Sequence, residues 1–296
     1  MLGKNEKTVS LVLGSGGARG LAHIGVIHWL EENGYRISSI SGSSMGALIG
    51  GIYAAGKLDV YEKWVRAINK LDIVTLLDLS WDMSGLVKGD KLINRLIDLV
   101  GDQQIEDLSI SFTAVATDLH EQKEVWINSG NLFDAIRASI SLPLFFTPFS
   151  YKGTDLIDGG VLNPVPIAPT FSDDTDFTIA VNLGGKMEEQ TEKHSPVVVE
   201  TDEDDTLSEI ISKFIEGLGK GSGEKGKVDL GMYDVANNAF DAMQGSIARQ
   251  KLAAYPPDYS IEIAMNACGM LEFDRAAEMI TLGHEKAAYY LSGIIR

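Results

Sequence analysis

The chain has 296 residues and a formal net charge of −17 at pH 7. Such an acidic balance argues against nucleic acid, whose phosphates need cationic partners, and disfavours polybasic docking on anionic membranes. An apolar content of 45% excludes wholesale disorder and is ample for a buried core. Cys268 is the only cysteine, which excludes an intrachain disulfide and a cysteine-based metal site and fits a reducing compartment.

The amino-terminal segment, residues 1–7, is polar and carries no apolar signal-peptide region. No stretch of the sequence approaches the roughly 20 apolar residues that span a bilayer. We therefore expect a soluble, cytoplasmic protein.

The first part of the chain alternates strand-like and helix-like patterns. The expected elements are a strand at 8–13, a glycine-rich loop at 14–20, a helix at 21–32, a strand at 35–41 and, after a Gly-x-Ser-x-Gly turn, a helix at 47–55. This order is typical of a largely parallel sheet that is covered by helices on both faces.

The remaining elements follow from the same patterns. Helical spacing covers 58–100 with a break at 80–89, strands are expected at 111–118, 124–127, 177–183 and 259–265, and further helices at 132–141, 232–254 and 274–295. Residues 142–149 form an apolar, proline-broken loop, and residues 151–156 lead into Asp158-Gly159-Gly160.

Two neighbouring segments have an unusual composition. Residues 188–205 carry eight acidic side chains and predict a solvated acidic loop; a calcium site is the alternative, although no EF-hand spacing is present. Residues 217–226 alternate glycine with lysine and serine, which predicts flexibility. We expect one domain over residues 1–296 with a mobile insertion at 186–227.

The Gly-x-Ser-x-Gly turn has the form of a nucleophile elbow. Gly42 and Gly46 allow a sharp turn and leave no Cβ to block close backbone approach, so Ser44 is held out at the edge of the sheet. The helix that follows points its N–H groups at any negative charge that develops there. A flexible loop of the same composition is the alternative.

The glycine-rich loop does not fit a dinucleotide site, because Gly-x-Gly-x-x-Gly from Gly14 requires glycine where Arg19 stands. Next to a serine nucleophile, the N–H groups of Gly16, Gly17 and Ala18 are candidate oxyanion donors. Arg19 either braces this loop or attracts an anionic head group. A tight turn that only packs a helix against the sheet has the same glycine requirement.

Ser44 needs a base, and none of the histidines has a flanking pattern that singles it out; they are His23, His28, His120, His194 and His284. Asp158 is the better candidate. It precedes Gly159-Gly160, so its carboxylate projects from a tight turn and could accept the serine proton. An ordinary Asp-Gly turn is the alternative.

Four blocks in fixed order resemble the patatin-like phospholipase family, in particular its small bacterial members; they are 13–26, 42–47, 137–143 and 158–160. The resemblance covers about residues 8–165. It implies a Ser44–Asp158 dyad without histidine, oxyanion donors at Gly16, Gly17 and Ala18, and a basic, substrate-binding position at Arg19. Ser15 departs from the family, since many members carry glycine there, and this affects only the number of oxyanion donors.

The resemblance implies a three-layer α/β/α fold around a mostly parallel sheet, and a serine acyl hydrolase of the esterase, phospholipase A or lysophospholipase type. We expect an acyl lipid or lysophospholipid substrate, walled by residues 142–149 and 73–81, with transient contact with a membrane surface and with no cofactor or metal. Two alternatives are an acyltransferase with the same dyad and a regulatory or adaptor protein that uses the acidic segment to engage a basic partner. The sequence does not indicate an oligomeric state.

Overall fold

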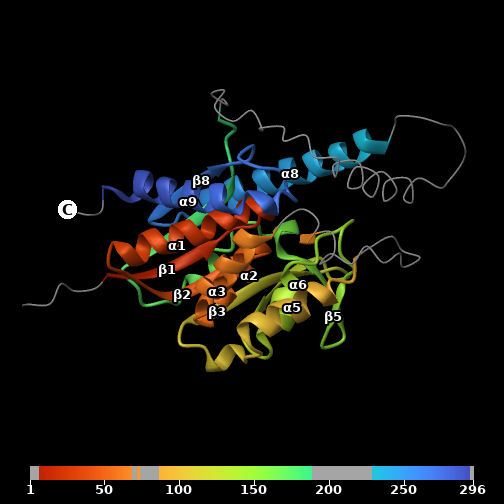
Figure 1. The fold of residues 1–296 in the computed structure, drawn as a ribbon, viewed down its shortest axis with the longest axis horizontal. Helices are drawn as coiled ribbons and strands as arrows, with labels where there is room; N and C mark the ends of the chain where they lie inside the picture. Colours follow the sequence, from red (N-terminus) through yellow and green to blue (C-terminus); the bar gives the residue numbers. More distant parts are fainter. Residues whose placement is uncertain (1–6, 69–71, 74–86, 189–228, 294–296) are drawn as a thin grey trace, which may run out of the picture.

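The computed structural model describes residues 7–68, 72–73, 87–188 and 229–293, which form one eight-stranded sheet with helices around it (Figure 1). The strands are β1 (Lys7–Leu13), β2 (Tyr35–Ser43), β3 (Ser111–Asp118), β4 (Lys123–Ile127), β5 (Phe149–Tyr151), β6 (Thr154–Asp158), β7 (Phe177–Gly185) and β8 (Tyr259–Ala264). The helices are α1 (Ala22–Glu32), α2 (Met45–Ala54), α3 (Leu58–Ala67), α5 (Asp90–Val100), α6 (Leu132–Ser139), α8 (Asp229–Ala254) and α9 (Ala276–Leu291).

The sheet has the strand order β5-β6-β3-β2-β1-β7-β8, with β4 paired to β3 outside this path. Strands β3, β2, β1, β7 and β8 run parallel, while β4, β5 and β6 join antiparallel, so the predicted mostly parallel sheet is confirmed. Leu13 pairs with Gly42 across β1 and β2. The glycine-rich loop and the serine turn therefore leave the sheet side by side at one edge.

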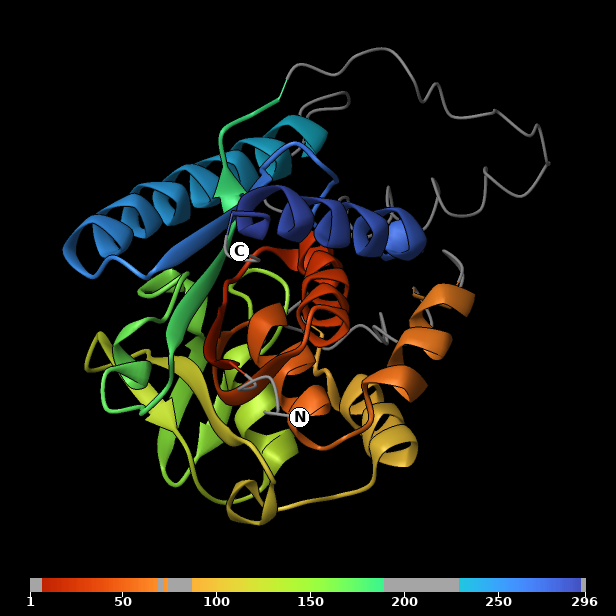
Figure 2. The same cartoon turned by 90° about the vertical axis from the view of Figure 1, so that its left-hand side faces the viewer.

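Alternation along the strands divides the core into two layers. Val9, Leu11 and Leu13 of β1 pack into the main core with α1, α2 and α9, whereas Val12 faces the opposite side and packs with Ala248 of α8. Figure 2 shows α8 on one side of β7, with α1 and α9 on the other. The predicted α/β/α layering is confirmed.

Helices α1 and α9 pack at unusually close range. A Cβ added at Gly283 would lie 1.9 Å from the carbonyl oxygen of Ala22, and one at Gly25 would lie 1.9 Å from that of Ile280. Glycine on both helices lets their backbones touch. Because α1 follows the glycine-rich loop directly, this contact also anchors that loop.

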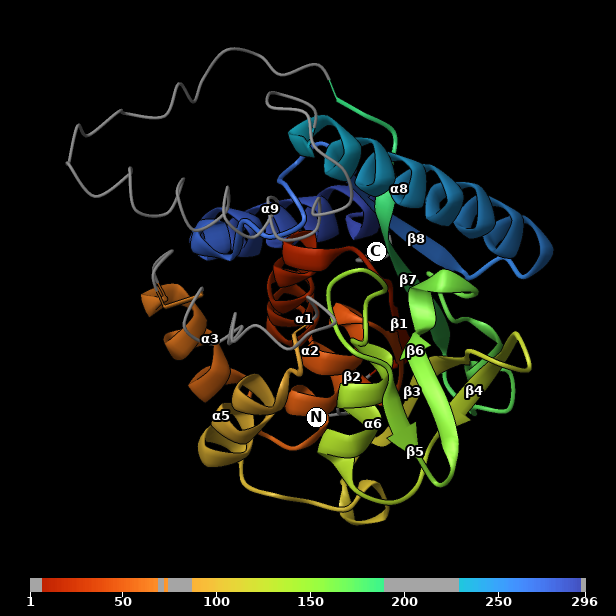
Figure 3. The same ribbon diagram turned by 90° about the vertical axis from the view of Figure 1, so that its right-hand side faces the viewer.

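The structure differs from the expected elements in a few places. The region 58–100 contains two described helices, α3 and α5, which lie next to each other (Figure 3). Residues 149–158 form the hairpin of β5 and β6, whereas the sequence predicts no strand in either half of it. Of the acidic segment, only Glu188 is described, and it pairs with Lys286; the rest, with the Gly/Lys segment, lies outside the described residues. None of the described helices is long and apolar enough to cross a membrane.

We predict that Gly283→Ala destabilises the fold, because its methyl group would overlap the Ala22 carbonyl. The expected loss is about 1–3 kcal/mol of unfolding free energy, measured by urea denaturation. Gly245→Ala in α8 is the matched control, since its nearest neighbour would be Arg249 Nη1 at 3.4 Å. Equal effects of the two substitutions would contradict the close α1–α9 contact.

Candidate active site

Ser44 lies between the end of β2 and the start of α2 with φ 54° and ψ −121°, a conformation that is costly for a residue with a side chain. Two glycines permit this turn. A Cβ at Gly42 would lie 2.5 Å from the Ala47 nitrogen, and one at Gly46 would lie 2.0 Å from the Leu13 carbonyl oxygen. The strand, sharp turn and helix that an elbow requires are therefore present.

Helix α6 holds the strained serine backbone from the other side. The Ser44 N–H donates to Ser139 Oγ at 2.9 Å, and the Ser139 hydroxyl donates to the Val115 carbonyl at 2.6 Å. Because Val115 pairs with Ser43 across β3 and β2, these bonds tie the turn to two strands and a helix.

Asp158, the last residue of β6, has no solvent exposure. Its N–H donates to the Ser141 carbonyl at 2.9 Å, and its Oδ1 accepts the Gly160 N–H at 2.7 Å. The adjacent Gly159 lies so close to Val115 that a Cβ would fall 2.0 Å from its carbonyl oxygen. The two glycines after Asp158 thus let the carboxyl group sit deep beside the strands that carry Ser44.

Burial raises the pKa of Asp158 to about 7, against hydrogen bonding from the Ser44 hydroxyl and the Gly160 N–H, which lower it. Asp158 Oδ2 nevertheless has no hydrogen bond of good geometry among the described residues. The serine hydroxyl therefore lies close enough to influence this carboxyl group, while Oδ2 stays available to accept a proton. Such a pKa suits a general base near neutral pH.

The glycine-rich loop presents two N–H groups without an acceptor among the described residues, those of Gly16 and Gly17. The Ser15 N–H donates to Pro164 at 2.8 Å, and the Ala18 N–H donates to the Met270 carbonyl at 2.8 Å. Gly17 has φ 56° and lines the same cavity as Ser44. Of the three expected donors, Ala18 is therefore occupied in this structure.

Arg19 is buried, and every nitrogen of its guanidinium donates to a protein acceptor. The bonds go to the Gly16 carbonyl at 3.0 Å, the Met265 carbonyl at 2.7 Å and Asp241 Oδ1 at 2.8 Å. Its expected role in substrate binding stays a prediction. The alternative, in which Arg19 braces the loop, accounts for all of these contacts, since the arginine joins the loop to α8 and to the end of β8.

None of the four described histidines is paired with Ser44 or Asp158. His23 is buried with Nε2 2.8 Å from the Gly14 carbonyl oxygen, and desolvation lowers its pKa to about 4. His28, His120 and His284 pair with Glu62, Asp155 and Glu32, and His194 lies outside the described residues. In the part of the chain that the structure describes, no group of three or more His, Cys, Asp or Glu could hold a metal ion.

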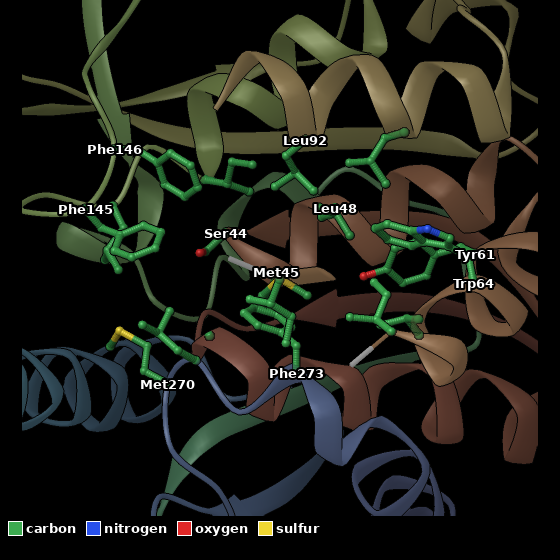
Figure 4. A pocket seen from close by; sticks show the side chains of 18 residues that line it. Ser44, Met45, Leu48, Tyr61, Trp64, Leu92, Phe145, Phe146, Met270 and Phe273 are labelled. Carbon is green, nitrogen blue, oxygen red and sulfur yellow. The ribbon is translucent and has the colours of Figure 1, made fainter. Parts of the chain in front are cut away.

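A cavity of about 110 Å³ opens beside Ser44, and its walls are almost entirely apolar (Figure 4). The lining residues are Gly17, Ser44, Met45, Leu48, Tyr61, Trp64, Val65, Ile68, Ile73, Leu92, Leu96, Ile140, Leu142, Phe145, Phe146, Met270, Leu271 and Phe273. Both expected walls contribute: three residues come from 142–149, and Ile73 comes from 73–81, of which residues 74–81 lie outside the described part.

Several residues around the site were not identified as functional in the sequence. Ser139 and Ser141 belong to the Arg-Ala-Ser block at 137–143. The match of this block to the family pattern marks it in the sequence, although the pattern gives neither serine a role. Met270 and Tyr61 come from regions that carry no motif, and only the folded chain brings them to Ser44.

Comparison with known proteins finds a family model, sequence relatives and a solved structure that are similar to this chain. A family model described as patatin-like phospholipase matches residues 11–171. An uncharacterised NTE family protein of Mycobacterium bovis is 37% identical over 98% of this chain and 92% of its own length. The lysophospholipase nte1 of Emericella nidulans is 32% identical over 60% of this chain, which corresponds to 12% of that longer protein. Among solved structures, VipD from Legionella pneumophila aligns with a TM-score of 0.46 and 14% identity, over 98% of this chain and 67% of that one.

We predict that Asp158→Asn stabilises the protein at pH 8. Because the pKa of Asp158 is raised to about 7, the folded state keeps a proton that the unfolded chain loses above about pH 4, so stability falls as pH rises between these values. Asparagine is neutral and keeps the acceptor for Gly160. The melting temperature at pH 8 should rise by about 2 °C or more.

Thermal melts at pH 5.5 and pH 8 measure this effect. The exposed Asp98 of α5 provides the control substitution, Asp98→Asn, which should leave the pH dependence unchanged. An Asp158→Asn variant whose melting temperature falls with pH as steeply as that of the wild type would contradict the burial of a charge at this position.

Proposed function

The chain belongs to the patatin-like phospholipase family, and we propose that it is a serine acyl hydrolase that cleaves lipid acyl esters with Ser44 and Asp158. The observation that carries the proposal is the combination of a strained serine, a fully buried carboxyl group beside it and two N–H groups without an acceptor among the described residues, next to an apolar cavity that Ser44 and Gly17 line. Each feature is costly to a fold, and each has a use in acyl transfer.

In the proposed reaction, Ser44 Oγ attacks the ester carbonyl while Asp158 accepts the serine proton. The Gly16 and Gly17 N–H groups donate to the oxyanion of the tetrahedral intermediate, and the amino-terminal end of α2 adds favourable dipoles. Asp158 then returns the proton to the leaving alcohol, which departs as the acyl-enzyme forms. Water attacks the acyl-enzyme, Asp158 again takes the proton, and the fatty acid is released as Ser44 recovers its hydrogen.

The apolar cavity supports a lipid acyl chain as the acyl group. It begins at Ser44 and is walled by aliphatic and aromatic side chains, which favour burial of a hydrocarbon chain over a polar acyl group. The fungal relatives that carry lysophospholipase names match this chain over a small part of their own length. On these grounds we propose a lysophospholipid or a related monoacyl ester as the substrate class.

Labelling with a fluorophosphonate probe tests the nucleophile. We expect the wild-type protein to be labelled, Ser44→Ala to remain unlabelled, and Asp158→Asn to be labelled slowly because its serine lacks a base. Hydrolysis of a lysophospholipid by Ser44→Ala should fall by about 10³-fold or more, measured as fatty acid release. Circular dichroism confirms that both variants fold. Label that persists in Ser44→Ala would exclude this serine as the nucleophile.

The pH dependence of kcat/KM tests the base. Because burial raises the pKa of Asp158 to about 7, the carboxylate that accepts the proton is depleted below that pH. We expect kcat/KM to rise with pH through about 7 and to fall about tenfold per unit on the acid side. Fatty acid release is measured from pH 5 to 9 with the Ser44→Ala background subtracted. Activity that remains level down to pH 5 would rule out a base with this pKa.

A further inference from the structure

Two side chains with a polar group, those of Tyr61 and Trp64, lie in the apolar wall of the cavity at a distance from Ser44, and of the two Tyr61 carries a hydroxyl. Tyr61 of α3 lines the cavity and is only 3% exposed, and its hydroxyl forms no hydrogen bond with any described residue. Figure 4 shows that Tyr61 enters from the side opposite Ser44 and Phe145, with the phenolic oxygen directed into the cavity. The described side chains at the far end of the pocket thus present a single hydroxyl to its contents.

The Tyr61 ring has little freedom to turn its hydroxyl toward solvent. Its ring centroid lies 5.7 Å from that of Trp64, at an interplanar angle of 48°. The backbone N–H of Tyr61 donates to the Lys57 carbonyl at 3.1 Å in the first turn of α3. The ring itself packs in the main core. The hydroxyl is therefore held in place by packing.

This arrangement distinguishes between two kinds of acyl chain. An unsubstituted chain that fills the cavity removes water from the hydroxyl and leaves it unpaired, which is unfavourable in an apolar environment. A chain that carries an oxygen atom at the level of Tyr61 restores one hydrogen bond, and the phenol can act as either donor or acceptor. Sites built around a buried hydrogen-bonding group reject ligands that lack its partner.

We propose that Tyr61 selects acyl chains that carry an oxygen function along the chain, such as a hydroxyl, keto or epoxide group, over unsubstituted chains. This inference rests on the proposed acyl hydrolase function of the same cavity. The expected preference is about 10-fold to 100-fold in kcat/KM, at the chain position that meets the phenol.

The test compares p-nitrophenyl esters of equal chain length, one unsubstituted and the others with a single hydroxyl at successive positions. The wild-type protein should prefer one hydroxyl position, and Tyr61→Phe, which keeps the ring, should reduce the preference to about one or below. Tyr53→Phe is the matched control, because the Tyr53 hydroxyl donates to Glu31 at 2.7 Å and does not line the cavity. This control should retain the wild-type preference.

Calorimetric binding of the corresponding free fatty acids to Ser44→Ala, with and without Tyr61→Phe, provides a readout that needs no hydrolysis. Equal kcat/KM and equal binding for all chains, or a preference that Tyr61→Phe does not change, would overturn the inference while leaving ester hydrolysis intact. Absence of hydrolysis together with a Tyr61-dependent binding preference would instead refute the proposed function and retain the selectivity of the cavity.

Discussion

The burial of the Asp158 carboxyl group is the constraint on which the rest of the site depends. A carboxyl group without solvent exposure is favoured in its neutral form, and only the Gly160 N–H and the nearby Ser44 hydroxyl oppose this effect. If more donors surrounded it, the pKa of Asp158 would fall and the carboxylate would become a weaker base. The sparse hydrogen bonding of Oδ2 is therefore part of what makes this group a suitable base near neutral pH.

The segment 139–141, at the carboxyl end of α6, positions both members of the proposed dyad, Ser44 and Asp158. Ser139 accepts the Ser44 N–H through its side chain, and Ser141 accepts the Asp158 N–H through its carbonyl group. The end of α6 is itself held in place, because the buried Arg137 donates to Ser141 Oγ at 2.6 Å. A shift of this segment would therefore move the serine and the carboxyl group together, which keeps their relative geometry constant.

How far the sequence predicts this structure depends on the range of the interactions involved. Short-range signals are sufficient for the elbow at Ser44 and the turn after Asp158, because glycine is required where a Cβ would fall within 2–3 Å of another group. The sequence leaves the role of Arg19 open, because its hydrogen-bond partners Asp241 and Met265 lie more than 200 positions away along the chain. The contacts of Ala18 and Tyr61 also depend on distant parts of the chain. The Ala18 N–H bonds to Met270, and Tyr61 faces Ser44 only after α3 folds across the cavity. Helix and strand patterns in a sequence indicate which face of each element is buried. The contacts of Arg19, Ala18 and Tyr61 depend instead on how these buried faces pack against one another.

The bond between Ala18 and Met270 joins the glycine-rich loop to the wall of the cavity. The Met270 carbonyl accepts the Ala18 N–H, its side chain lines the cavity, and a Cβ at Gly17 would lie 2.6 Å from the same carbonyl oxygen. A chain that presses against Met270 therefore acts on the backbone that carries the Gly17 N–H. In the proposed reaction, contacts far from the ester would in this way affect the N–H groups proposed to bind the oxyanion, so that binding energy along the acyl chain would help to align them.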